Sequence, residues 1–233
     1  VTYGGGTGHG ANADYILVPS RTLVHLHDSL SFEEGAAISC GTGTAWNGLQ
    51  KMNISGRDTV AVFGQGPVGL SGTLSAKAMG ARVIGVDVVP ERLSLAKELG
   101  ADHVINASDD DPVEAILDMT SGLGSTASLE TSGDTTARQQ VLRCLAPFGR
   151  CCYVGVGGPA EIDFNRDVIF KVVTIFGSWT FSKAELIEIS RFFAETGAPL
   201  SKLITHRYSL DQAEEAFKEF DSSTTGKCVF VMK

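Results

Sequence analysis

Long hydrophobic runs, basic residues and paired cysteines are all scarce in this sequence. No apolar run approaches the roughly 20 residues that a membrane-spanning helix requires, and no signal peptide opens the chain. The 19 Lys and Arg are outnumbered by 27 Asp and Glu, and the net charge of −8 argues against nucleic acid and membrane surfaces as partners. The 5 cysteines are odd in number and scattered, so no disulfide framework is indicated and a cytoplasmic location is expected.

The remaining composition is that of an ordinary globular protein. Hydrophobic residues make up 43% of the 233 residues and charged residues 20%, which is enough apolar material for one large domain or two small ones. Neither an internal repeat nor a low-complexity linker interrupts the chain. Because it begins with Val1 rather than methionine, we expect a fragment or a processed product.

A glycine-rich segment after an apolar strand is the strongest functional signal. The apolar run 60–63 predicts a buried strand that leads directly into Gly64-Gln-Gly-Pro-Val-Gly69. Gly64 permits a tight turn, Gly66 lets the backbone approach a pyrophosphate, and Gly69 lets the next helix pack closely. Pro67 suits the first turn of that helix, whose N-terminus offers N–H groups and a positive dipole end to phosphates.

An acidic residue follows at the spacing that dinucleotide binding requires. A second apolar strand, 82–87, ends in Asp87, about 20 residues after Gly66, where a carboxylate accepts hydrogen bonds from the adenosine ribose. Asp87 would also repel a 2′-phosphate, so the sequence predicts NAD(H) in preference to NADP(H). The alternative is a glycine-rich turn of an α/β protein that binds nothing.

Strand and helix patterns alternate through the middle of the chain, which predicts an α/β fold with a Rossmann-type, doubly wound parallel sheet. We expect strands near 58–63, 82–87, 103–105, 126–130, 149–154 and 172–177, and helices near 66–79, 90–99, 111–120, 134–146 and 165–170.

The two flanks do not continue this alternation. Before it we expect strands at 13–18 and 22–26, a helix at 32–38 that starts with the capping box of Ser31 and Glu34, a small-residue turn at 40–44 and a helix at 45–52. After it we expect a helix at 183–196, a strand at 203–208, a helix at 210–220 and a strand at 228–232. The simplest interpretation is a second domain into which the first is inserted.

Seven motifs in a fixed order span essentially the whole chain, at 10–19, 30–37, 40–45, 64–69, 99–102, 149–155 and 204–208. Together with the split arrangement they resemble the medium-chain dehydrogenase/reductase superfamily, and more closely its zinc-dependent alcohol and polyol dehydrogenases. The resemblance implies that 1–40 is the C-terminal remnant of a GroES-like, β-rich catalytic domain, that 41–177 is an NAD-binding Rossmann domain, and that 178–233 returns to the catalytic domain.

The resemblance also implies roles in cofactor binding. Thr44 and Val68 would pack against the nicotinamide ring, backbone groups of 154–156 and 174–176 would bind the carboxamide, 131–133 would border the adenosine side, and Arg92 would lie along its ribose. The full set implied to bind NAD is Gly64, Gly66, Pro67, Val68, Gly69, Asp87, Arg92, Thr131, Ser132, Val154, Gly155, Val156, Thr174 and Phe176.

Cys40 matches the position from which the family supplies a thiolate to its catalytic zinc, and zinc acts as a Lewis acid on the alcohol oxygen. The alternative is a small buried cysteine. The family's Cys-Gly-x-Asp/Ser and Gly-His-Glu segments and its four-cysteine loop are not in this sequence and would lie upstream of Val1. The resemblance thus implies zinc in a full-length parent, whereas Cys40 alone cannot complete a four-coordinate site.

His25 and His27 share one face of an expected strand end, and His9, His103 and His206 are expected at the surface or at strand ends.

These features favour an NAD-dependent zinc-type alcohol or polyol dehydrogenase in which Cys40 and Thr44 belong to the catalytic site and this chain alone is inactive. Two alternatives stay open: a zinc-free medium-chain reductase of the quinone or enoyl type, and a non-catalytic dinucleotide-binding remnant. The partners implied are a small alcohol or polyol and other copies of the chain, in a homodimer or homotetramer that pairs the apolar edge 172–176.

Overall fold

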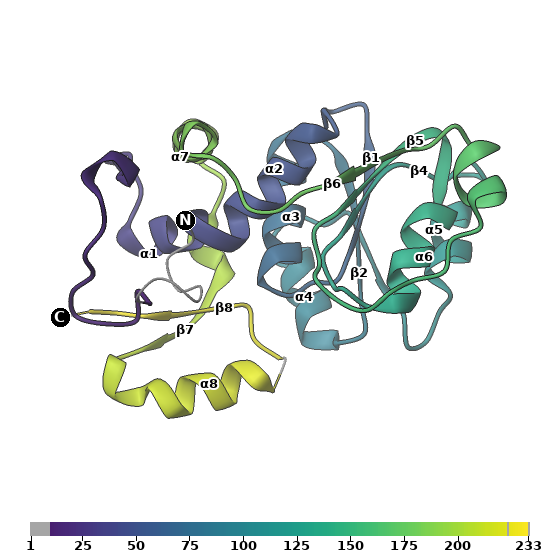
Figure 1. Cartoon of the computed structure of the whole chain (residues 1–233). Helices are drawn as coiled ribbons and strands as arrows, with labels where there is room; N and C mark the ends of the chain where they lie inside the picture. Colours follow the sequence, from purple (N-terminus) through teal and green to yellow (C-terminus); the bar gives the residue numbers. More distant parts are fainter. Residues whose placement is uncertain (1–9, 223, 233) are drawn as a thin grey trace.

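A six-stranded parallel sheet forms the centre of the protein (Figure 1). The computed structural model describes residues 10–222 and 224–232. The strands lie in the order β3-β2-β1-β4-β5-β6, and they are β1 (Thr59–Phe63), β2 (Arg82–Asp87), β3 (His103–Asn106), β4 (Ser125–Glu130), β5 (Leu145–Tyr153) and β6 (Thr174–Gly177). This is the doubly wound order in which the strand sequence reverses beside β1, and it confirms the predicted fold class.

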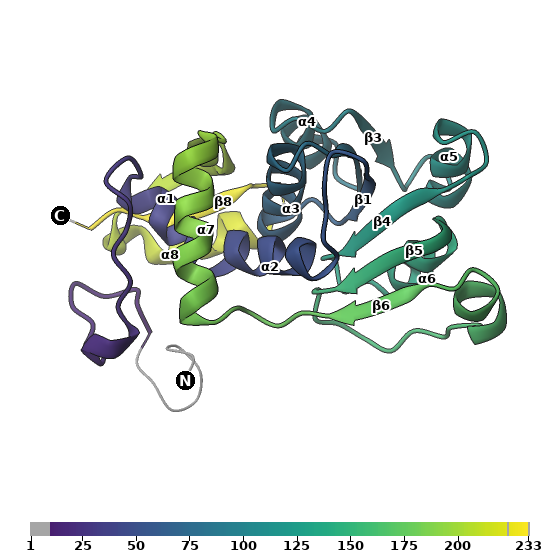
Figure 2. The ribbon, with the colours of Figure 1, turned by 90° about the horizontal axis from the view of Figure 1, so that it is seen from above.

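Helices cover both faces of the sheet (Figures 1 and 2). On one face lie α2 (Gly43–Lys51), α3 (Pro67–Ala78) and α4 (Pro90–Glu98), and on the other lie α5 (Pro112–Met119) and α6 (Thr135–Arg143). The side chains of β1 alternate between two hydrophobic clusters: Val60 and Val62 belong to the first, with Leu70 and Leu74, whereas Ala61 and Phe63 belong to the second. Because both faces are covered, β1 is apolar at successive positions.

The described segments before α2 and after β6 lie together beside the helices of the first face (Figures 1 and 2). This part contains α1 (Phe32–Ala37), α7 (Lys183–Thr196), α8 (Ala213–Asp221) and the parallel pair β7 (Ile204–Tyr208) and β8 (Lys227–Phe230). A bidentate ion pair joins the N-terminal and C-terminal segments of this part, with Arg207 Nη2 on β7 2.8 Å from Glu33 Oε2 on α1. Within the described ranges, no helix is long and apolar enough to cross a membrane.

The strands expected at 13–18 and 22–26 are not present, so this prediction was wrong. Residues 10–19 and 23–31 hold no helix or strand, and a 3-10 turn, Ser20–Thr22, lies between them. Tyr15 and Leu17 are 93% and 95% exposed. A strand needs a neighbouring backbone to satisfy its N–H and C=O groups, and in the described part of the chain β7 and β8 pair only with each other.

The predicted turn at 40–44 was also wrong, because the chain stays helical there. A π-helical segment, Ile38–Thr42, joins α1 to α2 without a break. Gly43 has helical angles (φ −62°, ψ −39°), and a Cβ there would lie 2.3 Å from the Phe181 ring and 2.6 Å from the Ile38 carbonyl oxygen. The small residues therefore serve close packing rather than a change of direction.

Smaller differences concern the segments before and after β5. The strand begins at Leu145, where the sequence predicted the end of a helix, and the helix expected at 165–170 is a second π-helical segment, Phe164–Ile169.

Candidate functional site

The turn between β1 and α3 contains three glycines with three different surroundings. Gly64 has a φ of +85°, which favours glycine, and a Cβ there would lie 2.9 Å from the backbone N of Ser132. A Cβ on Gly69 would lie 1.7 Å from the carbonyl oxygen of Gly64. At Gly66 no atom lies within 4 Å of the Cβ position. Gly64 and Gly69 are thus needed for the turn and its packing, while Gly66 borders open space.

Helix α3 begins directly at this open space. Gly66 is its N-cap, Pro67 is its first residue, and no side chain of the described residues caps the first turn. The first hydrogen bond from the helix back to the cap is donated by Leu70 to the Gly66 carbonyl, at 2.9 Å. The N–H groups of Val68 and Gly69 consequently lack intrahelical acceptors, and they add to the positive end of the helix dipole. An anion such as a pyrophosphate matches this arrangement.

Asp87 lies at the end of β2, next to the glycine turn, and its carboxylate is held by backbone donors. Its Oδ1 accepts from the N–H groups of Val88 at 2.8 Å and Val89 at 2.9 Å, and its Oδ2 accepts from the N–H of Gln65. A carboxylate oxygen has two lone pairs, so Oδ2 keeps one for a further donor. The carboxylate is thus chemically able to accept a further hydrogen bond, such as one from a hydroxyl group.

Gln65 is a structural residue that the sequence reasoning missed. Its buried side chain donates from Nε2 to the Val62 carbonyl and accepts at Oε1 from the Thr73 hydroxyl, both at 2.9 Å. It therefore ties the glycine turn to β1 and to α3. The motif treats this position as variable, so nothing local in the sequence marked it.

Thr131 and Arg92 are two further residues predicted on the adenosine side, and the structure links Thr131 to the same turn. Thr131, which follows β4, donates from Oγ1 to the carbonyl oxygens of Phe63 and Gly64, each at 2.9 Å. Arg92 on α4 is half-buried, and its Nε has no hydrogen-bond partner among the described residues.

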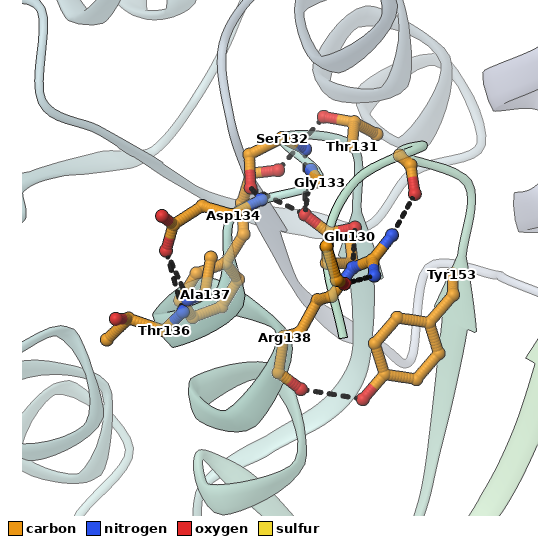
Figure 3. Close-up of polar contacts among 12 residues, drawn as sticks. Glu130, Thr131, Ser132, Gly133, Asp134, Thr136, Ala137, Arg138 and Tyr153 are labelled. Carbon is orange, nitrogen blue, oxygen red and sulfur yellow. Dashed lines mark hydrogen bonds and ion pairs between the residues drawn. The ribbon is translucent and has the colours of Figure 1, made fainter. Parts of the chain in front are cut away.

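A buried carboxylate organises the loop after β4 (Figure 3). The Glu130 side chain is 0% exposed, and its Oε1 accepts from the Ser132 N–H at 2.8 Å, the Ser132 hydroxyl at 2.6 Å and the Gly133 N–H at 2.8 Å. Arg138 on α6 lies opposite, with its Nε 3.9 Å from Glu130 Oε2. Neither residue was among the predicted site residues, although an acid at the end of a strand resembles Asp87.

Tyr153 on β5 also contacts this group of residues. Its hydroxyl donates to the Arg138 carbonyl at 2.7 Å (Figure 3). Burial, together with the nearby Cys151 and Glu130, raises the pKa of Tyr153 well above its ordinary value. The phenol therefore keeps its proton, with which it donates the hydrogen bond to the Arg138 carbonyl.

The predicted carboxamide residues are divided between two places. Val154, Gly155 and Val156 line an open hollow of about 640 Å³ together with Lys51 and Trp179, among others. In the sheet, Phe176 lies beside Cys152 and Thr174 beside Arg150. Thr174 is consequently farther from the carboxyl ends of the strands than the residues of the hollow.

The residues predicted at the nicotinamide ring lie near one another. The Thr44 hydroxyl donates to the Cys40 carbonyl at 2.8 Å. A Cβ on Gly41 would lie 3.6 Å from a methyl of Val68, so the π-helical segment packs against the first turn of α3. The Cys40 side chain is exposed, which contradicts the alternative of a small buried cysteine.

Zinc does not fit the residues that the structure describes. In residues 10–222 and 224–232, no three His, Cys, Asp or Glu side chains are placed to hold a metal ion. His27 bonds through Nδ1 to the Ser29 hydroxyl at 3.0 Å, and His25 lies 3.9 Å from Asp28. His9 lies outside the described residues. A four-coordinate site cannot be built around Cys40 from this set.

Comparisons with known proteins show which family the chain is similar to. A family model described as "Zinc-binding dehydrogenase" matches residues 67–195. The zinc-type alcohol dehydrogenase-like protein YphC of Escherichia coli is 38% identical over 222 residues, which are 94% of this chain and 63% of the relative. L-threonine 3-dehydrogenase of Pyrococcus horikoshii is 36% identical over 231 residues, which are 96% of this chain and 65% of the relative.

The solved structure of alcohol dehydrogenase TADH from Thermus sp. ATN1 superposes with a TM-score of 0.89 at 27% identity, covering 98% of this chain and 67% of that one. The chain thus spans slightly less than two thirds of the length of these two curated relatives.

Proposed function

Because the chain belongs to the zinc-binding dehydrogenase family, we propose that it is part of an NAD-dependent alcohol or polyol dehydrogenase and that 41–177 is its NAD-binding domain. The observation that carries the proposal is the open space at Gly66 at the uncapped N-terminus of α3, together with the Asp87 carboxylate, which accepts a hydrogen bond from the N–H of the adjacent Gln65. NAD+ supplies the hydride acceptor when it is bound.

The residues of this chain would bind and orient that cofactor. The α3 N-terminus would hold the pyrophosphate, and Asp87 would accept hydrogen bonds from the adenosine ribose. Thr44 and Val68 would restrict the nicotinamide ring from one side. Such restriction matters because a small misplacement of the ring loses much of the rate of hydride transfer. We also propose that the flanks 1–40 and 178–233 form one unit, supported by the contact of Arg207 with Glu33.

Cofactor binding is tested by titrating the 233-residue chain with NADH and NADPH and following nicotinamide fluorescence. We expect NADH to bind more tightly, because the fixed charge of Asp87 disfavours a 2′-phosphate. NADPH binding of equal or greater strength would contradict the choice of cofactor, and no binding of either would contradict the proposed function.

Activity of the 233-residue chain is a separate proposal. Oxidation of an alcohol requires stabilisation of a developing alkoxide, and among the described residues no group of three or more His, Cys, Asp or Glu side chains is placed to hold a metal ion at Cys40. We expect substoichiometric zinc and negligible oxidation of secondary alcohols or polyols. Zinc content by elemental analysis and an NADH-production assay check both. One zinc per chain with ordinary turnover would contradict the proposal, and turnover without zinc would favour the zinc-free reductase.

The exposed edge of the sheet and the free thiols bear on the oligomeric state and the cellular location of the protein. We propose a homodimer or homotetramer, since β6 pairs only with β5 among the described strands and Ile175 is exposed on it. A cytoplasmic location is supported by the five free thiols, because disulfides persist in oxidising compartments.

A further inference from the structure

The two loops at the carboxyl ends of β4 and β5 pack closely against each other at their glycines. A Cβ on Gly157 would lie 1.9 Å from the Gly133 carbonyl oxygen, and a Cβ on Gly133 would lie 2.3 Å from the Val156 carbonyl oxygen. The N–H groups of Val154 and Gly155 both donate to the Glu130 carbonyl, at 2.9 and 3.0 Å. The backbone of 154–157 is therefore positioned by the backbone of 130–133.

Arg138 holds the second loop from the side of α6. Its Nη2 donates to the Gly155 carbonyl at 2.7 Å, and its Nη1 donates to the Gly158 carbonyl. The planar guanidinium fork thus fixes two carbonyls of one loop at the same time, a task that a single ammonium group performs less well.

The hydrogen bond to Gly155 also determines where the next N–H points. In a trans peptide, the carbonyl oxygen and the following N–H lie in one plane and point in opposite directions. Because Arg138 draws the Gly155 carbonyl toward α6, the N–H of Val156 points away from α6. Among the hydrogen bonds of the described residues, none is donated by this N–H. Val156 is 74% exposed and lines the open hollow.

Glu130 supplies the charge that holds the guanidinium in this place (Figure 3). Its Oε1 is used by Ser132 and Gly133, so Oε2, which has no hydrogen-bond partner in the described part of the chain, faces Arg138 Nε at 3.9 Å. A carboxylate buried this deeply needs an opposing charge.

We propose that Arg138, held by Glu130, is a positioning residue that presents the Val156 N–H as a hydrogen-bond donor to the nicotinamide half of the dinucleotide. The proposal rests on the proposed NAD binding. Arg138 would therefore contribute to the affinity for a complete dinucleotide and not to the affinity for a ligand that lacks the nicotinamide.

The test compares NADH with ADP-ribose, which retains the adenosine and both phosphates but lacks the nicotinamide. In Arg138→Met we expect the dissociation constant of NADH to rise at least tenfold and that of ADP-ribose to change less than twofold. A merely structural role would weaken both ligands together. Arg138→Lys keeps the charge without the fork, and we expect an intermediate loss for NADH alone.

Arg143→Met is the matched control. Arg143 lies on the same helix, and its Nε is likewise unpartnered and 3.8 Å from a buried carboxylate, that of Asp167. We expect both ligands to bind this variant within twofold of wild type. If Arg138→Met does not fold, as judged by thermal unfolding, Arg138→Lys decides the test.

The outcomes separate the two proposals. If the wild-type chain binds neither ligand, the proposed function fails and the inference with it. If the wild-type chain binds both ligands equally, or if the Arg138 variants keep the wild-type ratio of the two dissociation constants, dinucleotide binding stands and the inference is overturned. Equal weakening of both ligands also overturns it.

Discussion

At the scale of single residues, the glycines of the β1–α3 turn differ in what a side chain would meet. Gly69 has the Gly64 carbonyl oxygen 1.7 Å from its Cβ position, whereas Gly66 has open space and a φ of −68° that any residue adopts. Packing and ligand access are therefore separable by substitution at two positions only three residues apart.

Gly69→Ala is expected to destabilise the protein by about 1–3 kcal/mol or more, because backbone must move to admit the methyl group. Gly66→Ala is expected to change the free energy of unfolding by less than ~1 kcal/mol and to weaken NADH binding at least tenfold. Urea unfolding and NADH titration of both variants check this. Tight NADH binding by Gly66→Ala would show that the open space is not the pyrophosphate site.

Asp87 presents a fixed negative charge because backbone N–H groups of Gln65, Val88 and Val89 hold its carboxylate. Asp87→Asn keeps the shape and removes the charge. We expect the ratio of the NADPH and NADH dissociation constants to fall about tenfold, since a hydrogen bond to a charged group contributes roughly 1.5–3 kcal/mol.

The control for this prediction is Asp102→Asn. Asp102 also accepts a backbone hydrogen bond, from Val83 at 2.8 Å, but pairs with Lys77. We expect this variant to keep the wild-type cofactor ratio. Fluorescence titration decides, and an unchanged ratio in Asp87→Asn would count against the role of this carboxylate.

At the scale of elements, an ion pair stabilises the segment that connects β5 to β6. Asp167, 1% exposed within Phe164–Ile169, accepts from Arg166 Nε at 2.7 Å and Nη2 at 3.0 Å. The hydrogen bonds from Arg166 hold the pKa of Asp167 below its ordinary value. A lowered pKa in the folded state means that the carboxylate stabilises the fold above its unfolded pKa and ceases to do so as the pH falls through the lowered value.

Asp167→Asn is therefore expected to lower the free energy of unfolding by about 1.5–3 kcal/mol at pH 7, with a difference from wild type that shrinks below pH ~4. Denaturant unfolding at pH 7, 5 and ~3.5 measures it. The control is Glu195→Gln, which removes an exposed ion pair with Arg191 and should cost less than ~0.5 kcal/mol. A constant difference between Asp167→Asn and wild type across these pH values would contradict the prediction.

At the scale of the whole molecule, the edge of the sheet at β6 carries exposed apolar side chains. Ile169, Phe170, Val172 and Ile175 are all exposed on or just before this strand. An unpaired apolar edge is an aggregation liability for a monomer, and pairing across a twofold would cover it.

We expect the wild-type chain to sediment as a dimer or larger oligomer at micromolar concentration, and Ile175→Lys to sediment as a monomer. Ile187→Lys on α7, an exposed position away from β6, is the control that should keep the wild-type state. A monomeric wild type would count against the proposed assembly.

The sequence predicted the central sheet because its signals are local. A strand that is apolar at successive positions, such as β1, needs no distant residue to be recognised, and the order of strands follows from the alternation with helices. The same holds for the glycine turn and for Asp87, which lie close together in the chain. Prediction was wrong at 13–18 and 22–26 because a strand exists only beside a partner, and wrong at 40–44 because Gly43 serves the contact with Phe181, far away in the sequence.

By itself, then, the sequence determined the fold class, the position of the glycine turn and the acid that follows it, since hydrophobic period and glycine geometry act over a few residues. Only the tertiary structure decided which polar groups meet. Gln65 beneath the turn, and Glu130 opposite Arg138, are buried polar side chains whose partners come from other elements. A buried polar group must find such a partner, and the identity of that partner depends on how the elements pack.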